Sequence, residues 1–123
     1  MPWRHEMKDY PKLRNELNAR ILELGEDAPG PLAGFRQLNK ESMADGVLST
    51  RVKELIALAI AITVRCDGCI AYHVHNALRA KASRAEIVEA IGVAVMMGGG
   101  PSLMYGAEAL EALEQFADIS PAA

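Results

Sequence analysis

The sequence predicts an all-α fold of about six helices, and three observations support this. Half of the 123 residues are apolar but only 5% are aromatic, in a chain rich in Ala, Leu, Glu, Arg and Ile, which favours helix over strand. Apolar residues recur at helical spacing, and short Gly- and Pro-containing segments separate the periodic stretches. A chain of this length holds one domain, which we expect to span residues 1–123.

The first two helices are expected on either side of a proline-rich break. A helix from about Tyr10 to Glu26, closed by Gly25, is predicted by apolar residues at three- and four-residue steps: Leu13, Leu17, Ile21 and Leu24. The segment 27–31 is the break. A second helix is predicted from Leu32 to Ala44, ending before Asp45 and Gly46, with an apolar stripe of Leu32, Phe35 and Leu38.

The third predicted helix is the most apolar. Ser49 and Thr50 offer an N-cap for a helix that runs from Arg51 towards Val64. Residues 55–62 are apolar on every side, which predicts a helix that is buried all round. A chain this small offers little cover for such a helix, so the pattern hints at a homo-oligomer.

Three further helices follow along the chain. The fourth is predicted from about Asp67 to Lys81, and residues 83–86 match a capping box that begins the fifth. Residues 98–100 are three glycines that break the chain, and Pro101 suits the first turn of the sixth helix. The tail of residues 120–123 is expected to fray.

Charge and composition exclude several classes of function. A net charge of −3 offers no basic surface for nucleic acid. The longest apolar run is far shorter than a membrane span, and the N-terminus lacks the pattern of a secretory signal, so we expect a cytoplasmic protein. Two cysteines are too few for a disulfide scaffold, and a close pair in that compartment is more often catalytic or metal-binding than structural.

The residues with chemical potential lie between Glu54 and His75. Cys66 is expected at the start of the fourth helix, with Cys69 one turn later on the same side. His73 lies four residues beyond Cys69, within about 40° of it on the helix surface. His75 points to the opposite side, where a surface or hydrogen-bonded role is expected.

Three physical effects favour reactive thiols in this arrangement. A helix N-terminus lowers the pKa of a cysteine from its free value of about 8.5. The imidazole of His73 can take the thiol proton, and a second thiol three residues away can convert an oxidised sulfur into a disulfide. Glu54 is the fourth candidate, because a carboxylate among apolar residues needs a partner, and proton transfer to His73 or a thiol supplies one.

These residues resemble a known family. The pattern Glu-x11-Cys-x2-Cys-x3-His, formed by Glu54, Cys66, Cys69 and His73, is similar to the AhpD-like alkylhydroperoxidase branch of the carboxymuconolactone decarboxylase family. The resemblance covers about residues 48–116 and includes the helix start at 83–86 and the break at 98–101. Some members carry a histidine or an aromatic residue where Gly68 stands, so a relay through that position is absent here.

The resemblance implies an all-helical bundle that assembles as a homotrimer or hexamer, and a peroxidase that needs no metal or other cofactor. It implies that Cys69 attacks the hydroperoxide, that Cys66 resolves the sulfenic acid as a disulfide, and that His73 and Glu54 relay protons. An external dithiol on a lipoyl-bearing or thioredoxin-like protein would regenerate the thiols.

Four alternatives remain open. The decarboxylase branch of the same family acts on a lactone by acid–base chemistry without cysteines. A redox-regulated binding module would form the disulfide without turnover. Zinc binding by Cys66, Cys69 and His73 lacks a second cysteine or histidine pair for a closed structural site. In the fourth alternative, both cysteines are inert buried thiols.

Overall fold

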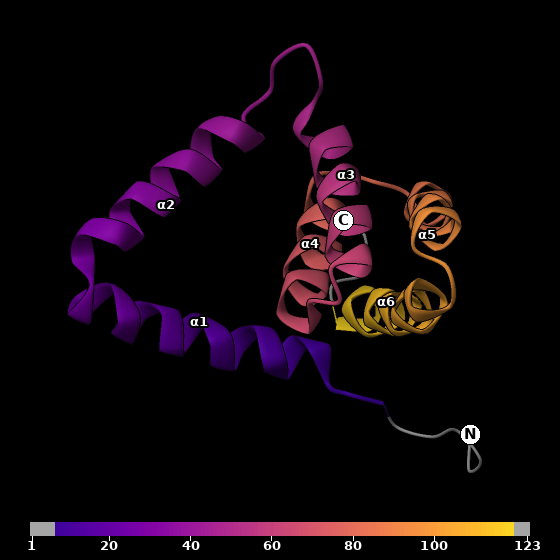
Figure 1. Cartoon of the computed structure of the whole chain (residues 1–123), viewed down its shortest axis with the longest axis horizontal. Helices are drawn as coiled ribbons and strands as arrows, with labels where there is room; N and C mark the ends of the chain where they lie inside the picture. The colour runs from indigo at the N-terminus through magenta and orange to yellow at the C-terminus, as the bar shows by residue number, and fades with distance from the viewer. Residues whose placement is uncertain (1–6, 120–123) are drawn as a thin grey trace.

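The computed structural model describes residues 7–119, which form six helices joined by short loops and contain no strand (Figure 1). The helices are α1 (Tyr10–Asp27), α2 (Pro29–Met43), α3 (Thr50–Thr63), α4 (Asp67–Arg79), α5 (Arg84–Gly98) and α6 (Gly100–Ile119). The predicted all-α class is therefore confirmed. The tail expected to fray, residues 120–123, lies outside the described residues.

Helices α3–α6 form a bundle that holds most of the core. Its fully buried side chains include Leu58 and Ile62 of α3, Ile70 of α4, Ile87 of α5 and Leu113 of α6. α3 packs against α4 and α5, and α6 closes the bundle against α4 and α5 (Figure 1). The start of α4, which carries both cysteines, is thus held by its neighbours on several sides.

Helices α1 and α2 form an arm outside this bundle. α1 crosses the ends of α4 and α6, whereas α2 stands away from the bundle and returns to α3 through a loop (Figure 1). None of the α2 residues is buried, and Phe35 and Leu38 of the predicted stripe are 66% and 62% exposed. The stripe is present, but residues 7–119 leave Phe35 and Leu38 mostly uncovered, and only Leu32 is partly buried.

The break between these two helices is shorter than the sequence predicts. α1 continues through Gly25 to Asp27, and α2 begins at Pro29, so only Ala28 separates them. Prolines are tolerated in the first turn of α2 because the N–H groups there have no partner within the helix. Pro29 and Pro31 therefore begin a helix instead of excluding one.

The prediction that α3 is buried on all sides is wrong for the single chain. Glu54, Leu58 and Ile62 face the bundle, but Ile56 and Ile60 are 46% and 55% exposed. α3 lies at the side of the bundle, and the other helices within residues 7–119 leave Ile56 and Ile60 about half exposed.

The connection between α5 and α6 depends on its glycines. A Cβ at Gly98 would lie 1.8 Å from Oγ of the buried Ser102, and Gly99 has a φ of 70°. Position 98 has no room for a side chain, and position 99 has a backbone conformation that glycine adopts readily. The predicted break at these residues is confirmed, and it reduces to the single linking residue Gly99.

No helix among residues 7–119 is both long and apolar enough to cross a membrane.

Candidate active site

The turn from α3 to α4 fixes the position of the first cysteine. The backbone N–H of Arg65 donates to the carbonyl of Ile62, and the N–H of Cys66 donates to the carbonyl of Ala61 at 3.1 Å. Arg65 has a φ of 61°, the left-handed conformation that commonly ends a helix. The chain therefore reverses sharply after α3 and presents Cys66 as the N-cap of α4.

The two cysteines lie together at the N-terminus of α4. A disulfide joins Cys66 to Cys69, with 5.2 Å between their Cα atoms. The backbone N–H of Cys69 also donates to Sγ of Cys66 at 3.1 Å. Both residues are half-buried, and the positive end of the helix dipole favours negative charge on sulfur at this place.

Glu54 and His73 form a hydrogen-bonded pair between α3 and α4. Oε1 of Glu54 lies 2.7 Å from Nδ1 of His73. The Glu54 side chain is only 8% exposed and the His73 side chain 24%. Because the carboxylate engages Nδ1, it fixes the ring orientation, and Nε2 is the imidazole nitrogen that does not contact Glu54.

The four residues singled out by the sequence thus lie around the start of α4. His73 follows Cys69 by one helical turn, which puts the imidazole and the sulfur on the same side of α4. Glu54 reaches this group from α3 through His73. A carboxylate, an imidazole and two thiols in this order can move a proton and form or break a disulfide.

His75 lies apart from this group. Its ring packs against Phe116 with centroids 5.2 Å apart, and its Nδ1 is 3.5 Å from Oδ1 of Asn76. Burial lowers the pKa of the His75 imidazole, and the nearby Arg14 lowers it further. The sequence predicts a surface or hydrogen-bonded histidine here, and the structure shows a half-buried ring packed on Phe116 beside Asn76.

The sequence did not indicate the contacts that α1 makes over the start of α4. A Cβ on Gly68 would lie 2.8 Å from Cδ1 of Leu17, so this glycine lets α1 approach the cysteines. The hydroxyl of Tyr72 bonds to Oδ1 of Asn18, and the guanidinium of Arg14 lies 5.2 Å from the Tyr72 ring centre. Tyr72 therefore joins α4 to α1.

A second set of charged residues reaches the cysteines from the N-terminal side. Lys8, just before α1, forms an ion pair with Asp67, which lies between the cysteines in the sequence. Nζ of Lys8 is also 3.7 Å from Oε1 of Glu108 on α6, and that oxygen accepts a hydrogen bond from the buried Tyr10 hydroxyl. The only sequence signal for this set was an acidic residue between the two cysteines.

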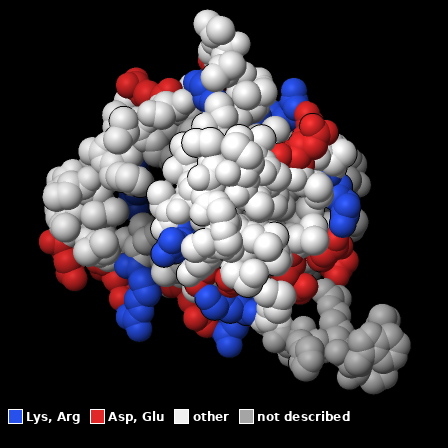
Figure 2. Space-filling view, turned by 45° about the vertical axis from the view of Figure 1, so that its right-hand side comes forward, with Lys and Arg blue, Asp and Glu red and all other residues white. Residues whose placement is uncertain are grey.

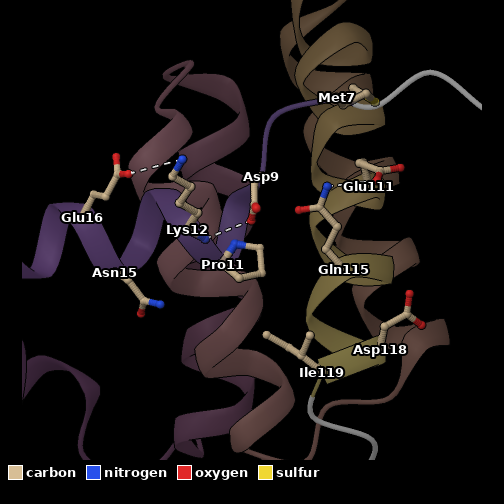
Figure 3. Close-up of a pocket in the computed structure, with 10 residues that line it drawn as sticks. All are labelled: Met7, Asp9, Pro11, Lys12, Asn15, Glu16, Glu111, Gln115, Asp118 and Ile119. Carbon is tan, nitrogen blue, oxygen red and sulfur yellow. Dashed lines mark hydrogen bonds and ion pairs between the residues drawn. The ribbon is translucent and has the colours of Figure 1, made fainter.

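Two other features bear on what the site can hold. Within residues 7–119, no group of three or more His, Cys, Asp or Glu residues is arranged to hold a metal ion. A pocket of about 740 Å³ opens between the start of α1 and the end of α6. Its lining includes Asp9, Lys12 and Gln115 but none of the four candidate residues (Figure 3).

Comparison with known proteins identifies related chains. The model of the carboxymuconolactone decarboxylase family matches residues 29–112. An uncharacterized protein of Cupriavidus necator is 39% identical over 95 residues, which are 77% of this chain and 84% of the relative. An uncharacterized protein from the cox locus of Paracoccus denitrificans is 41% identical over 81 residues, 66% of this chain and 73% of the relative.

Solved structures agree with these matches. A carboxymuconolactone decarboxylase family protein of Legionella pneumophila, in its apo form, superposes with a TM-score of 0.85 at 40% identity, covering 88% of this chain and 96% of that one. A family protein of Thermotoga maritima, suggested to take part in an antioxidative response, has a TM-score of 0.77 at 29% identity, covering 92% and 93%. This chain belongs to the carboxymuconolactone decarboxylase family.

Proposed function

We propose that this protein is a thiol-dependent peroxidase that reduces hydroperoxides through the Cys66–Cys69 pair. The observation that carries the proposal is the 2.7 Å contact between Glu54 and His73, one helical turn from Cys69. A buried carboxylate holding an imidazole beside a thiol is an arrangement that activates sulfur as a nucleophile. The antioxidative role suggested for the Thermotoga maritima relative supports the same reading.

The proposed cycle has three steps: reduction of the peroxide, formation of the disulfide and reduction of the disulfide. The Cys69 thiolate attacks the terminal oxygen of a hydroperoxide, the O–O bond breaks, and the alcohol leaves with a proton relayed by His73. The resulting sulfenic acid reacts with the Cys66 thiol to form the disulfide and water. An external dithiol then reduces the disulfide to two thiols and is itself oxidised to a disulfide.

Glu54 and His73 have separate roles in this cycle. His73 accepts the thiol proton of Cys69 at Nε2 and later returns it to the departing alkoxide. Glu54 stabilises the imidazolium formed in between, because its carboxylate is already bound to Nδ1. The cysteine chemistry itself needs no added cofactor.

The proposal also covers the reductant, the cellular compartment and the assembly of the protein. The reductant is a lipoyl-bearing or thioredoxin-like dithiol protein, and the cytoplasm is the compartment that keeps such dithiols reduced. We also propose a homo-oligomer, either a trimer or a hexamer. Figure 2 shows one face with a broad uncharged centre. Helices α5 and α6 also expose several large apolar side chains: Val93, Met96, Met97, Leu103 and Met104.

A lyase is the second candidate, since Glu54 and His73 also form an acid–base pair suited to the decarboxylase branch of the family. In that reaction the cysteines take no part. Alkylation of both thiols in the reduced protein distinguishes the two: the lyase keeps its activity and the peroxidase loses it.

Turnover of an organic hydroperoxide with a dithiol reductant tests the proposal. Reduced protein should consume cumene hydroperoxide, Cys69→Ser should not, and Cys66→Ser should accumulate a sulfenic acid that dimedone labels. Equal consumption by the native protein and Cys69→Ser contradicts the proposal. Formation of the disulfide without peroxide consumption assigns the protein as a redox-regulated binding module instead.

A further inference from the structure

The segment before α1 brings one positive charge to the cysteine pair. Lys8 forms an ion pair with Oδ2 of Asp67, the first residue of α4 and the neighbour of Cys66. The other carboxylate oxygen of Asp67, Oδ1, is buried and has no hydrogen-bond partner among the described residues. Lys8 therefore supplies a positive charge that compensates the carboxylate of Asp67, which lies inside the cysteine motif.

The position of Lys8 is fixed by α6. The side-chain amide of Gln115 donates to the backbone carbonyl of Lys8 at 2.8 Å, and its oxygen accepts from the backbone N–H of Tyr10 at 2.8 Å. Gln115 thus holds the chain on both sides of Asp9 and extends from α6 toward this segment (Figure 3). The Tyr10 side chain is fully buried and anchors the segment through Glu108.

This arrangement has an electrostatic consequence for the thiols. A carboxylate beside a thiol disfavours the thiolate, and a cation beside it favours the thiolate. Asp67 alone would oppose ionisation of both cysteines. The hydrogen bond to Asp67 raises the pKa of Lys8, so the amino group stays charged across the pH range in which thiols titrate.

We propose that Lys8 is a positioning residue for the redox reaction: Gln115 holds the backbone of Lys8 in place, and the charge of Lys8 offsets Asp67 and so favours the thiolate over the thiol in the reduced Cys66–Cys69 pair. This rests on the proposed function, because it concerns the same two sulfurs. It differs from the Glu54–His73 pair, which acts from α3 and from further along α4. Among the described residues, Arg65, which precedes Cys66, and Arg14 near Tyr72 also bring positive charge to the start of α4.

The test measures the first pKa of the reduced cysteine pair by pH-dependent alkylation and mass spectrometry, with far-UV circular dichroism as a check of folding. Lys8→Met should raise this pKa by about 0.5, the size expected of a partly exposed ion pair. Asp67→Asn should lower it. In the double variant, Lys8→Met should have a smaller effect than it has alone, because the carboxylate that Lys8 offsets is gone.

A matched control separates local charge from net charge. Lys12→Met removes the same charge from α1, where Lys12 lies 3.9 Å from Glu16 and outside the cysteine site, and it should leave the thiol pKa unchanged. The effect of Lys8→Met should also shrink at about 1 M salt, because screening weakens exposed pairs. Equal shifts from Lys8→Met and Lys12→Met, or no shift from Lys8→Met, overturn the inference.

The measurement of the thiol pKa and the assay of peroxide turnover can fail separately. If Lys8→Met raises the thiol pKa but the native protein consumes no hydroperoxide, the proposed peroxidase is wrong and the role of Lys8 in setting the thiol pKa stands. If the native protein consumes hydroperoxide and Lys8→Met leaves the pKa unchanged, the peroxidase stands and the role of Lys8 is excluded.

Discussion

The α3–α6 bundle and the α1–α2 arm use similar helices in different ways. Apolar residues of the bundle meet each other from several helices, and Leu58 and Ile62 are fully buried. In the arm, α2 buries nothing, and Phe35 is 66% exposed. The comparison shows that amphipathic periodicity predicts a helix reliably. The periodicity does not predict whether the same chain supplies the surface that covers the apolar face.

The largest difference between the two regions is expected in stability. Leu58→Ala should lower the free energy of unfolding by about 2–5 kcal/mol, because it leaves a cavity in a closed core. Phe35→Ala should change it by less than about 0.5 kcal/mol at low protein concentration. Urea denaturation measures both. Similar losses from the two variants would contradict the distinction between bundle and arm.

Glycine substitutions sharpen the same comparison. Gly98→Ala should lower the free energy of unfolding by about 1–3 kcal/mol, because its Cβ would collide with Ser102. At Gly34 of α2, nothing beyond the adjacent residues and the backbone of its own helix lies within 4 Å of the corresponding Cβ position. Gly34→Ala should therefore stabilise the helix by about 0.5–1 kcal/mol. Thermal unfolding of both variants measures the difference. A neutral Gly98→Ala would show that α5 and α6 do not approach closely there.

Tyr10 connects the arm to the bundle, and its contribution depends on pH. Burial raises the pKa of the Tyr10 phenol above its ordinary value of 10, and the hydrogen bond to Glu108 raises it further. The unfolded chain loses this proton near pH 10 while the folded chain keeps it, so stability is full below that pH and falls above it. Tyr10→Phe should cost about 1 kcal/mol at neutral pH, from the lost hydrogen bond.

Urea unfolding at about pH 8 and about pH 10.5 measures this effect, since the range spans the ordinary tyrosine pKa. The native protein should lose more stability across the interval than Tyr10→Phe does. Tyr72 and Tyr105 are present in both proteins, so the difference belongs to Tyr10. Equal losses would mean that the phenol of Tyr10 is not buried in the folded state.

The smallest expected effect concerns the turn before the cysteines. Arg65 has a φ of 61°, which glycine adopts with less strain, so Arg65→Gly should stabilise the fold by up to about 1 kcal/mol. Arg79 is the last residue of α4, where φ is not positive, so the same change should give no gain and should destabilise by up to about 0.5 kcal/mol. Chemical denaturation of both variants gives the comparison. Loss of stability in Arg65→Gly would contradict the strain assigned to this turn.

The sequence predicted the helices well because each has a local signal. The capping box at Ser83 and Glu86 is present as expected, and the glycines at 98–100 mark the α5–α6 connection. The break after α1 was predicted too long, because prolines at a helix start resemble prolines in a loop. The exposed face of α3 was missed, because burial depends on where the other helices pass.

The candidate site also contains contacts that the sequence could predict and one that it could not. The spacing of Cys66, Cys69 and His73 follows from one helix, so it could be read from the sequence alone. The contact of Glu54 with His73 joins two helices that are adjacent in the chain, so it could be proposed from the sequence. The approach of Lys8 to Asp67 joins residues 59 positions apart, and no local pattern indicates such a contact.

The pKa of the Cys69 thiol tests the central claim most directly. It is measured by pH-dependent alkylation in the Cys66→Ser protein, where a single thiol titrates, and again after His73→Ala is added. The account predicts a value below the free-cysteine value of about 8.5 in the first protein and a rise toward it in the second. The same pKa in both proteins would contradict the activation of Cys69 by the imidazole that Glu54 holds.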